Sequence, residues 1–252
     1  MKEVLKLSNS KKPRAVFFDV DDTMYDHLQP TREALQYVLK LEDSFPFEQA
    51  YHRIRYYSDI LADADGLLDR DPSPEELATM RVRRFMLALE EFDIKLSQSE
   101  AADVQEKYLE LQYRIDPFPG ARELIRALRE EGTLVGLITN GAEHHQGSKI
   151  RALALETDVA PEHIFISGAV GFAKPDPRIF YRVNELTGTA AEDCWYIGDS
   201  WRNDVVGASA AGWRVIWFNH RNTLPETEHM PFGTAGSYEE LRGLLMSHKN
   251  EI

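Results

Sequence analysis

The sequence of 252 residues contains a single cysteine, Cys194, which excludes an internal disulfide and any metal site built from several cysteines. No stretch approaches the roughly 20 consecutive apolar residues that a membrane-spanning helix needs. The first twelve residues carry charges but lack the apolar centre of a secretory signal. These absences predict a soluble protein of the cytoplasm with no membrane partner.

Positive charge is also scarce, because 29 Lys and Arg face 42 Asp and Glu and the formal net charge is −13. Binding to a nucleic-acid backbone requires concentrated positive charge, so no nucleic-acid partner is expected. A small anionic substrate is still compatible with this surplus, because a local site can override the global charge. The sequence carries no indication of an oligomeric state.

Two common binding motifs are missing as well. No Gly-x4-Gly-Lys-Ser/Thr loop is present, which excludes a P-loop nucleoside triphosphatase. An EF-hand starting at Asp19 would need Gly and Glu where the chain has Met24 and Pro30. An EF-hand calcium protein is therefore excluded too.

Short apolar runs rich in β-branched and aromatic residues predict buried strands. Their apolarity is continuous rather than alternating, as in a parallel sheet that is covered on both faces. Helix signals lie between the later runs, and Thr189 with Glu192 fits the pattern of a capping box. The alternation predicts an α/β fold with a Rossmann-like, doubly wound parallel sheet. The predicted strands are Arg14–Phe18, Thr133–Ile138, His163–Ser167, Cys194–Ile197 and Arg214–Phe218.

The long segment between the first two runs shows helical spacing of apolar residues and no strand pattern. Ser-x-x-Glu capping boxes at Ser73 and Ser97 indicate two of its helix starts. We therefore predict an α-helical bundle at residues 26–113, inserted into a core formed by residues 1–25 and 114–252.

The first predicted strand leads into two aspartates, Asp19 and Asp21. Residues i and i+2 of an extended segment point the same way, so both carboxylates could project beyond the carboxyl end of the strand. Open α/β sheets bind their ligands at that end. Paired carboxylates suit a bound cation or acid–base chemistry, although aspartates are equally common in ordinary turns.

Three later strands are followed by further polar residues. Thr139 and Asn140 end the second strand, and Lys174 stands between the third strand and a helix start. Asp199 ends the fourth strand, with Asp204 five residues on. Taken singly, each fits an ordinary polar turn or surface lysine as well as it fits a site. Their joint occurrence at strand ends favours a site.

Together these motifs resemble the four signature motifs of the haloacid-dehalogenase-like (HAD) hydrolases, and the helical insertion resembles the C1-type cap of subfamily I. The resemblance covers the whole α/β core. It rests on Asp19-x-Asp21-x-Thr23, Thr139, Lys174 and Gly198-Asp199 with Asp204, in this order.

The resemblance implies hydrolysis of a small phosphate monoester, a phosphorylated metabolite, through an aspartyl-phosphate on Asp19. Asp21 would be the general acid and then the general base. The implied cofactor is Mg²⁺, held by the carboxylates of Asp19 and Asp199 and by the main-chain carbonyl of Asp21. Asp204 fits an outer-shell or weaker ligand role.

The remaining motif residues are implied to handle the phosphoryl group. Lys174 would neutralise charge on the nucleophile and the phosphate. Thr139, with Asn140 beside it, would bind phosphoryl oxygens.

Several alternatives stay open at this stage. A haloacid dehalogenase also uses the first aspartate but lacks the second one, so the presence of Asp21 counts against it. A phosphomutase differs only in its acceptor, which the sequence does not reveal. A signalling receiver domain is about half as long and has no large insertion. A non-enzymatic phosphate-binding module would be indicated by the loss of Asp19, Asp21 or Lys174, all of which are present.

Overall fold

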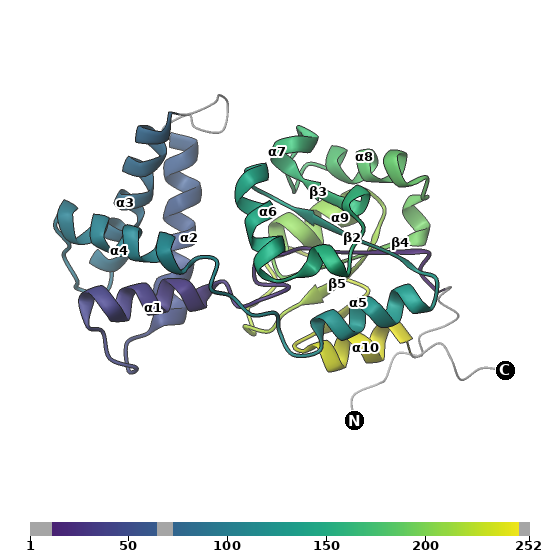
Figure 1. The fold of residues 1–252 in the computed structure, drawn as a ribbon, viewed down its shortest axis with the longest axis horizontal. Coiled ribbons are helices and arrows are strands. Elements are labelled where there is room, and N and C mark those ends of the chain that lie inside the picture. Colours follow the sequence, from purple (N-terminus) through teal and green to yellow (C-terminus); the bar gives the residue numbers. More distant parts are fainter. Residues whose placement is uncertain (1–11, 65–72, 247–252) are drawn as a thin grey trace. The chain divides into compact units, whose positions relative to one another are not determined.

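The chain divides into two compact units (Figure 1), which are described separately. Unit 1 comprises Met1–Asp26 and Asp116–Ile252, and unit 2 comprises His27–Ile115. The computed structural model describes residues 12–64 and 73–246. Within those two ranges, no helix combines the length and the apolarity needed to cross a lipid bilayer.

Unit 1 is built on a six-stranded sheet in the order β3-β2-β1-β4-β5-β6, in which all neighbouring strands are parallel. The predicted strands are confirmed. The sixth, β6, was not predicted, because its residues Gly-Thr-Ala form no apolar run. The strands are β1 (Ala15–Phe18), β2 (Leu134–Thr139), β3 (Ile164–Ile166), β4 (Cys194–Gly198), β5 (Arg214–Phe218) and β6 (Gly233–Ala235).

The order of the strands confirms the doubly wound topology. From β1 the chain builds outwards through β2 and β3, then returns to the other side of β1 and builds outwards through β4, β5 and β6. The direction of winding therefore reverses between β1 and β4. In open α/β sheets, the crevice beyond the strand ends at such a switch point is the usual ligand site.

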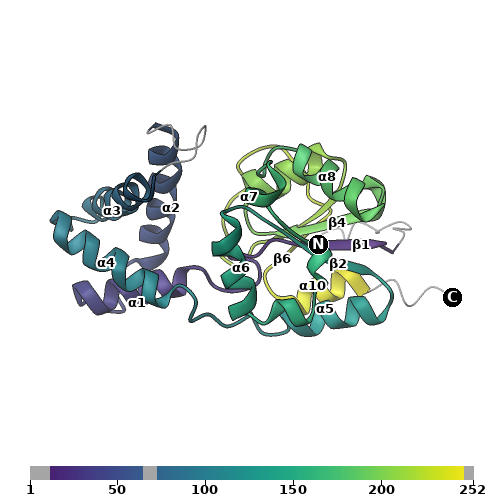
Figure 2. The same ribbon diagram turned by 45° about the horizontal axis from the view of Figure 1, so that its top comes forward.

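Helices cover both faces of this sheet, with α5 and α10 on one side and α8 on the other (Figure 2). The burial of all four residues of β1 follows from this cover. The helices of unit 1 are α5 (Ala121–Glu130), α6 (Glu143–Ala152), α7 (Ser167–Val170), α8 (Arg178–Thr187), α9 (Gly207–Ala210) and α10 (Tyr238–Met246).

One predicted helix start is wrong. Thr189 does not cap a helix, because only the short 3₁₀ turn η3 (Ala191–Asp193) follows it. The Thr189 hydroxyl instead accepts a hydrogen bond from Asn184 Nδ2 at 3.0 Å. A Ser/Thr-x-x-Glu pattern predicts a helix only where an apolar helical stripe follows, and here strand β4 begins at once.

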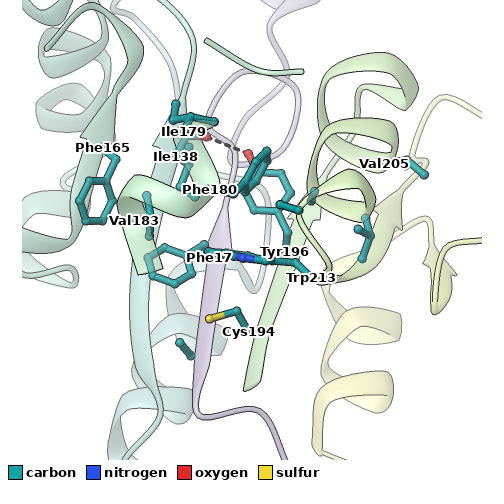
Figure 3. Close-up of a cluster of buried hydrophobic side chains, with 14 of the residues drawn as sticks. Phe17, Ile138, Phe165, Ile179, Phe180, Val183, Cys194, Tyr196, Val205 and Trp213 are labelled. Carbon is teal, nitrogen blue, oxygen red and sulfur yellow. Dashed lines mark hydrogen bonds between the residues drawn. The ribbon is translucent and has the colours of Figure 1, made fainter. Parts of the chain in front are cut away.

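The core between the sheet and α8 is aromatic (Figure 3). The Trp213 ring lies 5.1 Å from that of Phe17 and 5.3 Å from that of Phe180, centroid to centroid. Tyr196 lies in the same cluster, and its hydroxyl donates a hydrogen bond to the main-chain oxygen of Ile138 at 2.8 Å, drawn as a dashed line in Figure 3. A buried tyrosine hydroxyl needs such a partner. The contact ties β4 to the end of β2.

Unit 2 contains the predicted helices. At both Ser73 and Ser97, the hydroxyl accepts from the main-chain N–H three residues on, and the glutamate there accepts from the serine N–H. Phe47, Ile54 and Phe85 belong to the buried cluster that holds the helices together. The helices are α1 (Leu28–Leu39), α2 (Phe47–Ala64), α3 (Pro74–Glu90) and α4 (Gln98–Leu111).

Candidate active site

The candidate site lies in unit 1, at the carboxyl ends of β1 and β4. Phe18 at the end of β1 is in register with Ile197 near the end of β4. The Asp19 main-chain N–H donates to the Ile197 carbonyl oxygen at 2.9 Å, so β1 and β4 stay paired up to the residue that leaves the sheet. Asp19 and Asp199 therefore emerge side by side at the switch point.

Three carboxylates gather there. One oxygen from each of Asp19, Asp199 and Asp204 lies within 4.8 Å of the others. Thr23 connects the two strand ends, because its hydroxyl donates to Asp199 Oδ1 at 3.4 Å and accepts from the Asp199 N–H at 3.1 Å. Clustered carboxylates repel each other unless a cation or a proton lies among them. The cluster is thus a candidate site for a divalent metal.

Lys174 supplies a positive charge to this cluster. Its ammonium group is buried and donates to Asp19 Oδ1 at 2.8 Å, to Asp204 Oδ1 at 2.6 Å and to the Tyr196 hydroxyl at 2.7 Å. Burial alone would lower the pKa of Lys174, but attraction to Asp19 and Asp204 outweighs it and raises the pKa. Lys174 is therefore a fixed cation with all three of its donors used.

The environment of Asp19 disfavours its ionised form. Burial is the largest cause that raises the pKa of Asp19 to about 7. Attraction to Lys174 opposes this shift, and repulsion from Asp204 and Asp21 adds to it. A cation among the three carboxylates would favour the ionised form of Asp19.

Asn140 positions Lys174. Its side-chain Nδ2 donates to the Lys174 carbonyl oxygen at 2.8 Å, and its Oδ1 accepts from the Lys174 N–H at 2.9 Å. The side chain of Asn140 is therefore engaged in holding the Lys174 backbone. Thr139, the last residue of β2, is buried at the same strand end.

Asp204 reaches the cluster because Gly198 has no side chain. A Cβ added at Gly198 would lie 2.3 Å from Asp204 Oδ2, far inside contact distance. Asp204 lies in the π-helical turn η4 (Trp201–Val206) and has no solvent exposure. Its second oxygen accepts from the Ser200 N–H at 2.9 Å. The hydrogen bonds of Asp204 therefore hold Lys174 and the loop after β4 in place.

Asp21 has a different set of neighbours. Its two carboxylate oxygens each lie 2.8 Å from the buried ammonium group of Lys149. Its Oδ1 also accepts from the Tyr25 hydroxyl at 2.7 Å, and its Oδ2 accepts from Gln146 Nε2 at 3.1 Å. We call Tyr25, Gln146 and Lys149 the Asp21 clamp.

The neighbouring aspartate, Asp22, is not one of the clustered carboxylates. It is buried, with a backbone φ of 59°, and its Oδ1 accepts from Arg221 Nη2 at 2.7 Å. The same Arg221 atom also donates to Asp26 Oδ1 at 2.5 Å. Arg221 thus fixes the loop after β1 at both Asp22 and Asp26.

The sequence prediction missed Tyr196, Gln146 and Lys149. Tyr196 could have been suspected, because a tyrosine in a fully buried strand needs a polar partner. Gln146 and Lys149 are three residues apart, which places them on one face of α6 beside the buried Ile150. That spacing indicates a shared partner but does not identify it.

The comparison with known families identifies the family to which this chain belongs. A family model described as haloacid dehalogenase-like hydrolase matches residues 13–212. The chain belongs to the haloacid dehalogenase-like hydrolases. It is thus a hydrolase, and the family predicted from the sequence is confirmed.

Individual proteins are similar over nearly the whole chain. A glyceraldehyde 3-phosphate phosphatase of Pyrococcus abyssi is 28% identical over 94% of both chains. An N-acylneuraminate-9-phosphatase of Mus musculus is 29% identical over 93% of this chain and 94% of its own length. A solved HAD-hydrolase structure, YfnB of Bacillus subtilis bound to magnesium, is 25% identical with a TM-score of 0.70, covering 94% of this chain and 100% of that one.

Proposed function

We propose that this HAD-like hydrolase is a Mg²⁺-dependent phosphomonoesterase whose nucleophile is Asp19. The observation that carries the proposal is the position of Asp19 at the end of β1, bonded to the buried ammonium of Lys174 and clustered with two further carboxylates. The similar proteins from Pyrococcus abyssi and Mus musculus are named as phosphatases, which supports the same reaction class here.

The residues present fit a magnesium ion. The clustered donors are carboxylate oxygens, which Mg²⁺ prefers over nitrogen or sulfur. The carboxylates of Asp19 and Asp199 and the main-chain carbonyl of Asp21 would hold the ion, with Asp204 behind them. When bound, Mg²⁺ would offset negative charge on the phosphoryl group and polarise it.

The chain's own residues then account for each bond made and broken. A carboxylate oxygen of Asp19 attacks phosphorus while the bond from phosphorus to the leaving oxygen breaks, which yields an aspartyl-phosphate. Asp21 enters the cycle protonated and gives this proton to the leaving alkoxide, which departs as the alcohol and leaves Asp21 as a carboxylate. In the second half of the reaction Asp21 takes a proton from the water that attacks the aspartyl-phosphate and restores Asp19.

The phosphoryl oxygens need donors of their own during both steps. The Thr139 hydroxyl and the Asn140 main-chain N–H are proposed for this role. Lys174, positioned by Asn140, offsets the charge that builds up beside Asp19. The motifs at the sheet edge recognise only the phosphoryl group, so we assign the choice of the organic part to residues 26–113.

The presence of Asp21 favours a phosphatase over a haloacid dehalogenase of the same fold, because attack on a carbon–halogen bond needs no proton donor for an alkoxide. A phosphomutase would share every step up to the aspartyl-phosphate and would then use a substrate hydroxyl in place of water. Release of inorganic phosphate from a phosphate monoester separates the two.

The test is the isosteric substitution Asp19→Asn, assayed for phosphate release with and without Mg²⁺. An amide is a poor nucleophile, so kcat should fall by at least about a thousandfold. Asp103→Asn, the same change at an exposed position of α4, is the matched control and should retain full activity. Mg²⁺-dependent activity that survives in Asp19→Asn would overturn the proposal.

A further inference from the structure

We infer that Gln146 and Lys149 of α6, together with Tyr25, are positioning residues that hold the Asp21 carboxylate in the orientation in which it accepts a proton from the attacking water. The inference rests on the proposed role of Asp21 in hydrolysing the aspartyl-phosphate. It adds α6 to the four strand-end motifs as a fifth element of the site.

The geometry of the clamp is specific to a carboxylate that accepts hydrogen bonds. Lys149 has only donors, and it contacts both oxygens of Asp21 at 2.8 Å. Gln146 also presents its donor, because Nε2 lies against two acceptors, Asp21 Oδ2 at 3.1 Å and the Asn140 carbonyl oxygen at 2.9 Å. This pattern fixes which end of the Gln146 amide faces Asp21.

The position of Gln146 depends on the turn that follows β2. Gly141 has a φ of +143°, in the region that favours glycine, and a Cβ there would lie 3.0 Å from Gln146 Cγ and Nε2. The side chain of Gln146 therefore packs directly over the Gly141 backbone. Through its bond to Asn140, Gln146 links the Asp21 carboxylate to the loop that positions Lys174.

A contribution to stability does not by itself explain why Lys149 forms a buried ion pair with Asp21. Its side chain is 2% exposed, and Asp21, whose side chain is 19% exposed, is its carboxylate partner. Replacing a buried ion pair by apolar residues of similar volume is often neutral or stabilising, so a buried pair is weak evidence for a structural role. A charged pair at the edge of the proposed site instead suits a carboxylate whose orientation matters for chemistry.

The second step of the reaction can be isolated with an aryl phosphate, whose leaving group hardly needs protonation. With this substrate, Lys149→Met should release one equivalent of the phenol in a burst whose rate stays within about threefold of the wild type. Its steady-state turnover should then be about tenfold slower or more, since a general base contributes roughly 10²–10⁴-fold. Phosphorylated enzyme should accumulate and be visible by intact-protein mass spectrometry.

Asp21→Asn and the double variant Asp21→Asn/Lys149→Met complete the experiment. Asp21→Asn alone should also accumulate phosphorylated enzyme. Adding Lys149→Met to Asp21→Asn should not slow the steady-state turnover further, because Lys149 acts through Asp21. Arg151→Met removes an exposed cation of the same helix and is the matched control. It should keep wild-type turnover.

A general loss of packing would lower the burst and the turnover together, and this result for Lys149→Met would overturn the inference. Unchanged turnover without phosphoenzyme would also overturn it. If Lys149→Met does not fold, Tyr25→Phe removes one donor from Asp21 while keeping the buried ring, and the same accumulation is expected. If phosphorylated enzyme accumulates in Asp21→Asn but in neither Lys149→Met nor Tyr25→Phe, the proposed function holds and only the positioning role of the Asp21 clamp is wrong.

Discussion

Gly198→Ala tests whether the close approach of Asp204 to the end of β4 is what positions Lys174. The added Cβ would lie 2.3 Å from Asp204 Oδ2 and 2.4 Å from Asp204 Cγ. Ordinary contacts between heavy atoms begin near 3.5 Å, so the Asp204 side chain must move by about 1 Å. Gly198 lies in β4 and is not among the glycines with positive φ, so alanine meets no backbone strain there. The effect of the substitution is therefore steric.

The cost follows from the two hydrogen bonds that this movement breaks or lengthens. Asp204 accepts from Lys174 Nζ at 2.6 Å and from the Ser200 N–H at 2.9 Å, and it is fully buried. Hydrogen bonds to charged groups contribute about 1.5–3 kcal/mol each, so Gly198→Ala should lower the free energy of unfolding by about 3 kcal/mol. Misplacing the Lys174 ammonium by about 1 Å should lower kcat/KM about a hundredfold.

Urea unfolding and the hydrolysis of an aryl phosphate at saturating Mg²⁺ measure the two effects. Gly243→Ala, the same substitution in α10, is the matched control, because a Cβ there meets nothing within 4 Å. A helix interior favours alanine over glycine, so the free energy of unfolding of this control should rise by about 0.5–1 kcal/mol and its activity should be unchanged. The steric reasoning about Asp204 is wrong if the free energy of unfolding of Gly198→Ala stays within about 1 kcal/mol of the wild type and its kcat/KM stays within about twofold.

Three further predictions concern stability, the support of Lys174 and the choice of substrate. Burial alone would raise the pKa of Asp158, but hydrogen bonds to its carboxylate from two α5 arginines, Arg126 and Arg122, hold the pKa below its usual 3.8. The stability that ionised Asp158 contributes is therefore present above about pH 4 and lost at lower pH. In urea unfolding at pH 7, Asp158→Asn should lower the free energy of unfolding by about 1–3 kcal/mol. The difference in stability between this variant and the wild type should disappear below about pH 4. Tyr196→Phe removes one of three acceptors around Lys174 and should cost about 1–2 kcal/mol of stability but less than tenfold in kcat, measured by the same two assays. Exchanging residues 26–113 for the equivalent segment of a related enzyme should reorder kcat/KM over a panel of phosphorylated metabolites and leave Mg²⁺ dependence intact; an unchanged order would place selectivity in unit 1.

The sheet and the residues at its edge could be predicted because both depend on local sequence. A strand that is buried on both faces must be apolar along its length, and β1 and β5 carry that signal in consecutive residues. Once the strands are assigned, parallel pairing brings their carboxyl ends to one edge without further information. Asp19 and Asp199 could be placed there for this reason.

The side-chain partners could not be predicted in the same way. Whether Lys149 reaches Asp21, and whether Asn140 bonds to the Lys174 main chain rather than to a ligand, depends on how α6 and the Lys174 loop lie against the sheet. No local pattern in the sequence specifies those angles. The short edge strand β6 could not be predicted because its three residues pair with β5 but form no apolar run of their own.

The lysines also define the charge balance of the site. Lys174 pairs with Asp19 and Asp204, and Lys149 pairs with Asp21. With Asp199, the site gathers four carboxylates around these two ammonium groups.

A divalent cation would offset the repulsion among these carboxylates, which is the electrostatic reason for expecting a metal ion here. Lys149→Met would remove one positive charge beside Asp21, so this variant should reach half-maximal activity at a lower Mg²⁺ concentration than the wild type. Titrating the activity with Mg²⁺ measures this directly. A Lys149→Met enzyme that needs more Mg²⁺ would have lost its metal site rather than the orientation of Asp21, and its slow turnover would then have a different cause.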